Sequence, residues 1–379
     1  MEQWKRNASL YLAWALQQAL VAESGVLVDF LPADGLIRHF SPEEEALMGQ
    51  SMERLVEKLL RLRLKTTAVR IQCSSATSPE VIYVAVAHAV RVIMQARRDA
   101  HQNAPVPAVA ASSRVSSPSG PSPASSQQQQ PQPPPPPPPQ QQQRAQVSTE
   151  SPQFSLVLIL QDVERAPART LECVSEMLTH KFLSAPPSTT LLVPGSGVDR
   201  IDLPSPFLVI ATSTIAPVLS PSTTLANQAN EMALPARVLN SMLLRIPIIL
   251  PREAPVAAPE LPPIESKLPL HAVNAVFVSP SITKFLRDLL VALRMHEYVA
   301  RGPPIGAYDH LLLAVRINAS LNRRHFVIPL DVELCAVEVL AHQVLIRTDR
   351  LALAEQKHHP LAIARRLVVA VLEDLPVLR

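Results

Sequence analysis

Short apolar runs along the chain predict β-strands that are buried on both faces. The clearest run covers residues 156–160, LVLIL, which has no polar alternation and ends abruptly at Gln161. Similar runs at residues 25–30 and 68–73 predict two further strands, and residues 191–193 predict a hairpin strand. Runs of this kind are typical of parallel sheets, in which helices cover both faces.

Between these runs, apolar residues recur at helical spacing. This spacing predicts helices over residues 8–22, 41–64 and 81–94 and over the stretch that follows Pro167. Farther along, it predicts only helices, at residues 282–293, 311–315, 326–345 and 361–372. The pattern therefore predicts an α/β fold with a parallel sheet sandwiched by helices, followed by an all-helical C-terminal domain.

The composition changes at residues 98–153, where Ser, Gln and Pro dominate and residues 133–139 are all proline. Such a segment buries too little apolar surface to offset its ordering entropy, so we expect disorder. The proline run favours a polyproline II rod, a ligand for SH3 or WW domains; the alternative is a tolerated insertion in a surface loop. The predicted division is a core at residues 1–97 and 154–250 around this insertion, a Pro-rich linker at 251–274, and a helical domain with a C-terminal helix at 275–379.

Charge and cysteine content exclude several classes of partner and site. The net charge is only +3 over 379 residues, so we expect neither nucleic acid nor a membrane as a partner. Three widely spaced cysteines predict reduced thiols in the cytoplasm, with the nucleus as the alternative, and argue against secretion. Cys335 and His342 share a predicted helix face, but two ligands do not make a zinc site, so no metal is expected there.

The segment that starts at residue 158, LILQDVERAPARTLECVSEML, carries a family resemblance. It resembles the Walker B segment of AAA+ ATPases of the MoxR and magnesium-chelatase group, which reads LLADEINRAPPKTQSALLEAM. Two later segments, LPSPFLVIATSTIAP and LPARVLNSMLLRI, resemble the family's LPEPFFVLATQNP and LPEAQLDRFLLRI. The resemblance is best to the fungal magnesium-chelatase-like proteins and covers nearly the whole chain outside residues 98–153. It implies an AAA+-type core and a helical lid domain.

The resemblance also assigns catalytic positions, and this sequence departs from the family at each of them. The family's metal-binding Asp falls on Gln161, and its catalytic Glu falls on Asp162. Its sensor-1 Asn falls on Thr214, its DRF Arg, which contacts nucleotide across the subunit boundary, on Ser241, and its sensor-2 Arg on Gly306. A Gln cannot supply the anionic oxygen that magnesium prefers, and Asp is one methylene shorter than Glu.

The phosphate-binding loop is altered as well. A Walker A loop needs glycines, so that backbone N–H groups approach phosphate, and a Lys that reaches the β- and γ-phosphates. The corresponding loop at residues 31–39, LPADGLIRH, has one glycine and no lysine. Within this loop, the residues expected in the place of the phosphate-binding segment are Leu31, Pro32, Ala33, Asp34 and Gly35, and we describe this segment as a degenerate phosphate loop.

Acidic side chains follow the predicted strand at residues 156–160. Asp162 and Glu164 stand close together, and Glu172 lies farther along the predicted helix. We expect Asp162 and Glu164 to pair with Arg165, Arg169 or the following helix N-terminus rather than to bind a metal.

An intact apolar pattern with altered catalytic positions predicts a catalytically degenerate AAA+-like module. Such a module would act through protein contacts, as a scaffold or as a partner subunit in a homo- or hetero-oligomer with AAA+ subunits, and without a cofactor. The alternative is an ATP-dependent magnesium-chelatase-like subunit that inserts magnesium into a porphyrin and needs ATP and magnesium. A third hypothesis is an adaptor whose working part is the insertion at residues 98–153.

Overall fold

The computed structural model describes residues 8–31, 65–102, 154–186, 200–213, 234, 236–249, 268–352, 358 and 360–376. Several sequence predictions lie outside these residues: the helix at 41–64, the hairpin strand at 191–193, Thr214, the phosphate loop after Leu31, and most of the insertion at 98–153 and of the linker at 251–274.

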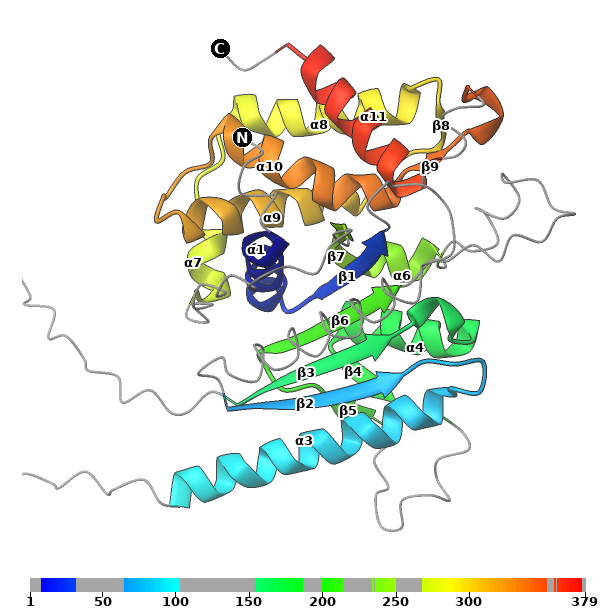
Figure 1. The fold of residues 1–379 in the computed structure, drawn as a ribbon. Coiled ribbons are helices and arrows are strands. Elements are labelled where there is room, and N and C mark those ends of the chain that lie inside the picture. Colours follow the sequence, from blue (N-terminus) through cyan, green and yellow to red (C-terminus); the bar gives the residue numbers. More distant parts are fainter. Residues whose placement is uncertain are drawn as a thin grey trace, which may run out of the picture.

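A parallel five-stranded sheet forms the centre of the molecule (Figure 1). Its strands are β1 (Gly25–Leu31), β2 (Lys65–Gln72), β3 (Phe154–Gln161), β6 (Phe207–Ser213) and β7 (Met242–Ile249), in the order β2-β3-β6-β1-β7. All neighbouring strands run parallel. The strands predicted at residues 25–30, 68–73 and 156–160 are confirmed, and β2 begins earlier than expected because Lys65 pairs with Phe154.

Helices cover both faces of this sheet because alternate strand residues point to opposite sides. On one face, Val26 and Val28 pack with α1 (Ala8–Ala22) and with the C-terminal helices. On the other face, Leu27 packs with three helices: α3 (Pro79–Gln102), α4 (Ala168–His180) and α6 (Ala236–Ser241). The predicted fold class, a parallel sheet between helical layers, is confirmed.

The C-terminal part of the chain is mainly helical, as predicted. It contains α7 (Leu270–Asn274), α8 (Pro280–Met295), α9 (Ala307–Leu321), α10 (Pro329–Leu340), α11 (Pro360–Asp374), two short 3-10 helices, η3 (Ala341–Gln343) and η4 (Thr348–Arg350), and a ribbon of β8 (Val299–Arg301) and β9 (Leu345–Ile346). Ser279 caps α8, since its hydroxyl oxygen accepts a hydrogen bond from the Ile282 amide at 3.2 Å.

Three predicted boundaries need correction. Helix α3 continues to Gln102, past the predicted start of the insertion, because Val90 and Ala96 still pack against the core and the helix ends only after a polar last turn. Helix α7 occupies the end of the predicted linker, since Val273 is fully buried. The helix expected over residues 326–345 ends at Leu340 and gives way to η3 and β9.

Two smaller elements complete the described chain. Strands β4 (Phe182–Ser184) and β5 (Arg200–Asp202) form an antiparallel ribbon beyond α4. A 3-10 turn, η1 (Val163–Arg165), joins β3 to α4. Among the described helices, none combines the length and the apolar character that crossing a bilayer requires.

Candidate functional site

The candidate site lies at the carboxyl ends of the parallel strands, where α/β folds place their ligands. Strand β3 ends at Gln161, beside Gln72 at the end of β2. On the other side of β3, Leu160 pairs with Ala211, so the end of β6 lies next to Gln161. Strand β1 ends nearby and leads into the predicted phosphate loop. The fold therefore places the Walker B positions and the start of that loop together at the carboxyl ends of the strands.

Gln161, in the position of the family's metal-binding Asp, is buried and already has a partner. Its side-chain oxygen accepts a hydrogen bond from Arg70 Nε on β2 at 2.7 Å. Only 8% of the residue is exposed. The one oxygen that could face a cation is thus directed to a guanidinium on the neighbouring strand.

Asp162, in the position of the catalytic Glu, is held by two side chains. Its carboxylate accepts a hydrogen bond from Gln72 Nε2 at 2.6 Å. Arg165 Nη1 lies 4.0 Å from the same carboxylate, which confirms the predicted pairing of Asp162 with Arg165. The backbone of Asp162 is left-handed, with φ 50° and ψ 50°, a conformation that Asp tolerates better than most residues. This conformation turns the chain from β3 into η1.

These residues do not fit a magnesium site of the kind that the family resemblance implies. Magnesium prefers anionic oxygen ligands in near-octahedral geometry, but the Gln161 oxygen is neutral and accepts from Arg70. Within the ranges that the structure describes, no three His, Cys, Asp or Glu side chains are grouped so that they could hold a metal ion.

A buried ion pair at the same end of the sheet was not singled out from the sequence. Arg245 on β7 donates two hydrogen bonds to the Asp29 carboxylate on β1, at 2.5 and 3.0 Å. Asp29 pairs in register with Ser213, whose hydroxyl is buried without a partner among the described residues. The available signal was one acidic and one basic residue, each inside an otherwise apolar strand.

Ser241, in the position of the DRF Arg, lies at the opposite end of the strands. It is the last residue of α6, directly before β7 begins. Its hydroxyl donates to the Val238 carbonyl at 2.8 Å, and its own carbonyl accepts from Ser24, the residue before β1. Through Val209 of β6, Gly25 at the start of β1 is level with Leu158 of β3, four residues before Asp162. Ser241, beside Ser24, therefore lies at least ~13 Å from Asp162 along the strand direction.

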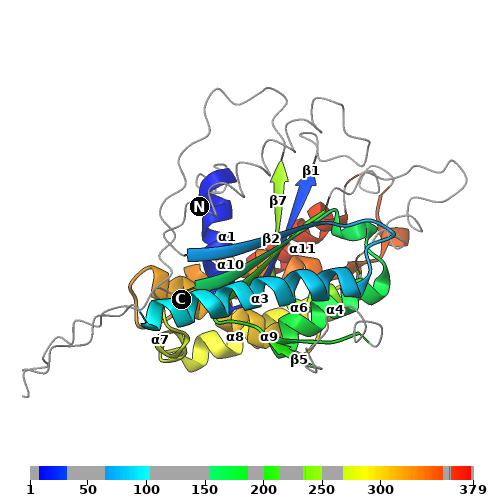
Figure 2. The same cartoon turned by 90° about the horizontal axis from the view of Figure 1, so that it is seen from below.

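Gly306, in the sensor-2 position, also lies toward the amino ends of β1 and β7. It precedes α9, and its carbonyl accepts from the His310 amide at 3.2 Å. Burial and Lys181 lower the pKa of His310, and Lys181 donates to the Glu23 carbonyl just before β1. Figure 2 shows the arrowheads of β1 and β7 pointing away from α8 and α9. The structure thus places Gln161 and Asp162 together at the carboxyl end of β3, and it places Ser241 and Gly306 toward the amino ends of β1 and β7.

A polar groove of about 700 Å³ runs along α4 and α6. Arg169, Glu172, Glu176, Arg237 and Ser241 are among the residues that line it. Cys173 also lines the groove, and burial, together with Glu176 and Glu80, raises the pKa of its thiol to about 12. The described cysteines are all free, as the sequence predicted.

Comparison with known proteins supports the fold and not a specific activity. No protein-family model matches the sequence, and no curated protein matches it. Among solved structures, it is similar to a protein from Cytophaga hutchinsonii ATCC 33406 that is described as a "putative ATPase". The TM-score is 0.54 at 15% sequence identity, over 99% of this chain and 93% of the other. At this identity the likeness concerns the fold alone, and the narrower assignment to fungal magnesium-chelatase-like proteins stays a prediction. The chain therefore shares with that protein an α/β fold, a parallel sheet flanked by helices and followed by a set of C-terminal helices.

Proposed function

We propose that this chain is an AAA+-like module that does not hydrolyse ATP and acts through protein contacts, as a scaffold or as a partner subunit. The observation that carries the proposal is the hydrogen bond from Arg70 to Gln161, 2.7 Å long. The side chain in the metal-binding position is neutral and is engaged within the sheet.

The chemistry of phosphoryl transfer supports the same conclusion. The transition state is stabilised by charges placed around the γ-phosphate and its magnesium ion. Gln161 replaces one such charge, and the loop at residues 31–39 contains no lysine. Asp162 keeps a carboxylate, but Gln72 and Arg165 contact it. Because the charge at position 161 and the loop lysine are missing and the Asp162 carboxylate has other partners, we expect no hydrolysis of ATP.

The positions of Ser241 and Gly306 support an oligomer. Both lie toward the amino ends of β1 and β7, whereas Asp162 lies at the carboxyl end of β3. Residues on that side lie away from the Walker B positions of the same chain. We therefore propose that the chain assembles with copies of itself or with other AAA+ subunits, and that Ser241 and Gly306 contribute no positive charge to the neighbour's site.

The alternative function is that of an ATP-using, chelatase-like subunit that inserts magnesium into a porphyrin. Its support is the similarity in fold to a protein described as a "putative ATPase". This alternative requires that nucleotide and magnesium bind in spite of the replacements at the Walker positions.

Calorimetric titration of the purified full chain with ATP and ADP, with and without magnesium, separates the two functions. We expect no heat of binding up to millimolar nucleotide. Magnesium-dependent binding that is lost in Asp162→Ala but kept in Asp202→Ala would overturn the proposal and favour the ATP-using subunit. Asp202 is the matched control because it is an exposed aspartate on β5, away from the sheet edge.

The adaptor hypothesis needs a deletion that respects the structure. Because α3 continues to Gln102, the segment to remove is residues 103–153 rather than 98–153. If the deletion variant keeps the same binding partners in a quantitative pull-down, the insertion is not the working part. Loss of the partners from a folded deletion variant would support the adaptor.

A further inference from the structure

The N-terminal helix α1 lies between the sheet and the C-terminal helices (Figure 1). Its residues Leu16 and Leu20 belong to the same buried cluster as Val28 of β1 and Leu311 of α9. One hydrophobic core therefore continues from the sheet through α1 into the C-terminal part. Apolar contact alone is not directional, however, and does not fix how the two parts are oriented.

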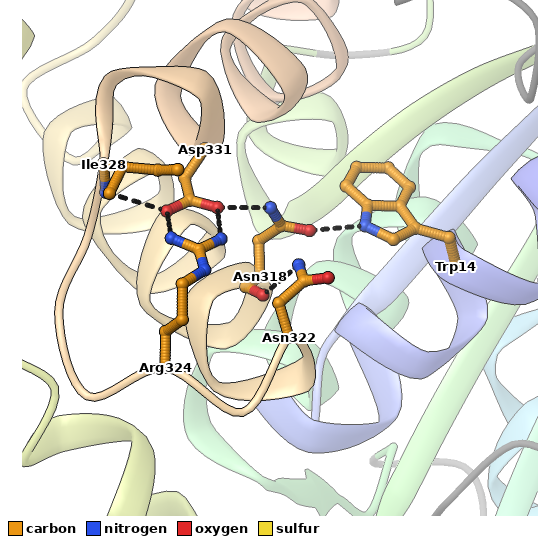
Figure 3. Close-up of polar contacts among 6 residues, drawn as sticks. All are labelled: Trp14, Asn318, Asn322, Arg324, Ile328 and Asp331. Carbon is orange, nitrogen blue, oxygen red and sulfur yellow. Dashed lines mark hydrogen bonds and ion pairs between the residues drawn. The ribbon is translucent and has the colours of Figure 1, made fainter.

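The first polar connection runs from Trp14 on α1 to α9 and α10, as Figure 3 shows. The indole Nε1 donates to Asn318 Oδ1 at 2.9 Å, and Asn318 Nδ2 donates to Asp331 Oδ1 at 2.7 Å. Arg324 donates two hydrogen bonds to the same carboxylate, at 2.5 and 2.7 Å. The Ile328 amide also donates to it, at 2.9 Å. Asp331 is fully buried, so each of these donors offsets its loss of hydration.

The second connection lies one helical turn earlier on α1. Tyr11 is buried, and its hydroxyl lies near the ion pair of Glu338 on α10 and Arg365 on α11. Burial and the Glu338 carboxylate raise the pKa of the Tyr11 hydroxyl well above its usual value. The rings of Tyr11 and Trp14 stack at 6.2 Å with an interplanar angle of 10°.

The two connections are matched in spacing. Tyr11 and Trp14 are three residues apart and share one face of α1. Asp331 and Glu338 are seven residues apart, two turns of α10, and both are fully buried. Each carboxylate is paired with an arginine. Asp331 is linked to Trp14 through Asn318, and Glu338 lies near Tyr11. Displacement of α1 would leave the buried Asn318 Oδ1 without the donor that Trp14 supplies, which makes that displacement unfavourable.

We propose that α1 is a latch that fixes the C-terminal helices to the sheet through Tyr11 and Trp14, so that the two parts move as one body. Helix α1 leads directly into β1, the strand that precedes the predicted phosphate loop. Separate opening of the C-terminal helices therefore requires that the Trp14–Asn318 hydrogen bond break and that Tyr11 leave the Glu338–Arg365 pair. The latch does not depend on whether the chain binds nucleotide.

Amide hydrogen exchange, followed by mass spectrometry on the full chain, tests the latch with Tyr11→Phe and Trp14→Phe. Both variants keep a ring and remove one hydrogen-bonding group. We expect peptides from α9 to α11 to exchange about tenfold faster in each variant, while peptides from α3 and β2 keep wild-type rates. Tyr83→Phe is the matched control, because Tyr83 is an equally buried tyrosine in the cluster on the other face of the sheet.

Three outcomes would overturn the latch. The first is unchanged exchange of α9 to α11 in both variants. The second is an equal acceleration of all peptides, which would mean that the hydroxyl and the indole stabilise the protein as a whole. The third is the same loosening of α9 to α11 in Tyr83→Phe. Circular dichroism shows beforehand whether each variant is folded. If one of the two variants does not fold, the other is tested alone against the same outcomes.

Discussion

Asp29 on β1 and Arg245 on β7 form a bidentate ion pair, although they are 216 residues apart in the sequence. Both side chains are largely removed from water, with side-chain exposures of 1% and 10%. The pair fixes the edge strand β7 against β1 just before the chain enters the predicted phosphate loop.

Removal of Asp29 should therefore be costly. We expect Asp29→Ala to lower the free energy of unfolding by about 3–5 kcal/mol, because Arg245 is left as a buried, unpaired cation. Urea titration monitored by circular dichroism measures the effect. Asp202→Ala is the control, since its ion pair with Arg200 is exposed and is expected to contribute less than ~1 kcal/mol. Equal losses in the two variants would contradict a structural role for the buried pair.

Substitution of Gly306 and of Gly302 by alanine should affect the stability of the protein in opposite ways. A Cβ on Gly306 would have no neighbour within 4 Å, whereas a Cβ on Gly302 would lie 2.8 Å from Arg294 Cα. We expect Gly306→Ala to be neutral or to stabilise by up to ~1 kcal/mol, and Gly302→Ala to destabilise. Thermal unfolding of the two variants gives the comparison.

The same space permits restoration of the family's arginine. Gly306→Arg should fold with a melting temperature close to that of the wild type, because the position is exposed and its φ of −65° suits any residue. A clear loss of stability in Gly306→Arg, but not in Gly306→Ala, would mean that a long side chain at this position meets the protein.

His342 should make the protein less stable as the pH falls. Burial, Arg245 and His310 lower the pKa of His342 from 6.5 to about 3, so the ring stays neutral in the native state. Below about pH 6.5 the unfolded chain binds a proton that the native state does not bind, so the free energy of unfolding falls with pH. The expected loss between about pH 7.5 and pH 5.5 is ~1–2 kcal/mol.

Urea titrations at several pH values test this dependence. His342→Gln should flatten the loss between about pH 7.5 and pH 5.5, whatever its own stability. His88→Gln is the control, since His88 is exposed on α3 and its replacement should leave the slope unchanged. If the free energy of unfolding of His342→Gln falls with pH as steeply as that of the wild type, His342 is not the source of the pH dependence.

Cys173 should react slowly with alkylating agents although it lines the groove. Because burial and Glu176 raise the pKa of its thiol to about 12, little thiolate exists near neutral pH. We expect its alkylation by iodoacetamide to be at least about tenfold slower than that of free cysteine. Glu176→Gln should accelerate the reaction, and peptide mass spectrometry measures it residue by residue. Wild-type alkylation as fast as that of free cysteine would refute this prediction.

The apolar pattern by itself determined the fold class. Runs such as residues 156–160 predicted strands, because a strand covered on both faces has no polar alternation, and helical spacing predicted α3, α4 and α8. The order of these elements was sufficient to predict a parallel sheet between helices. The positions Gln161 and Asp162 were located through the resemblance of the segment that starts at residue 158 to the Walker B segment of AAA+ ATPases.

Tertiary structure decided which polar groups meet. Gln161 accepts from Arg70, which is 91 residues away, and Trp14 donates to Asn318, which is 304 residues away. No local pattern specifies such partners, because they depend on strand order, on register and on the face that each helix presents. The same holds for Ser241, whose distance from Asp162 follows from the parallel strands between them. The sequence therefore determined most of the elements and, through the resemblance, the positions that differ from the family's catalytic residues. Packing determined which side chains meet there and what holds the C-terminal helices in place.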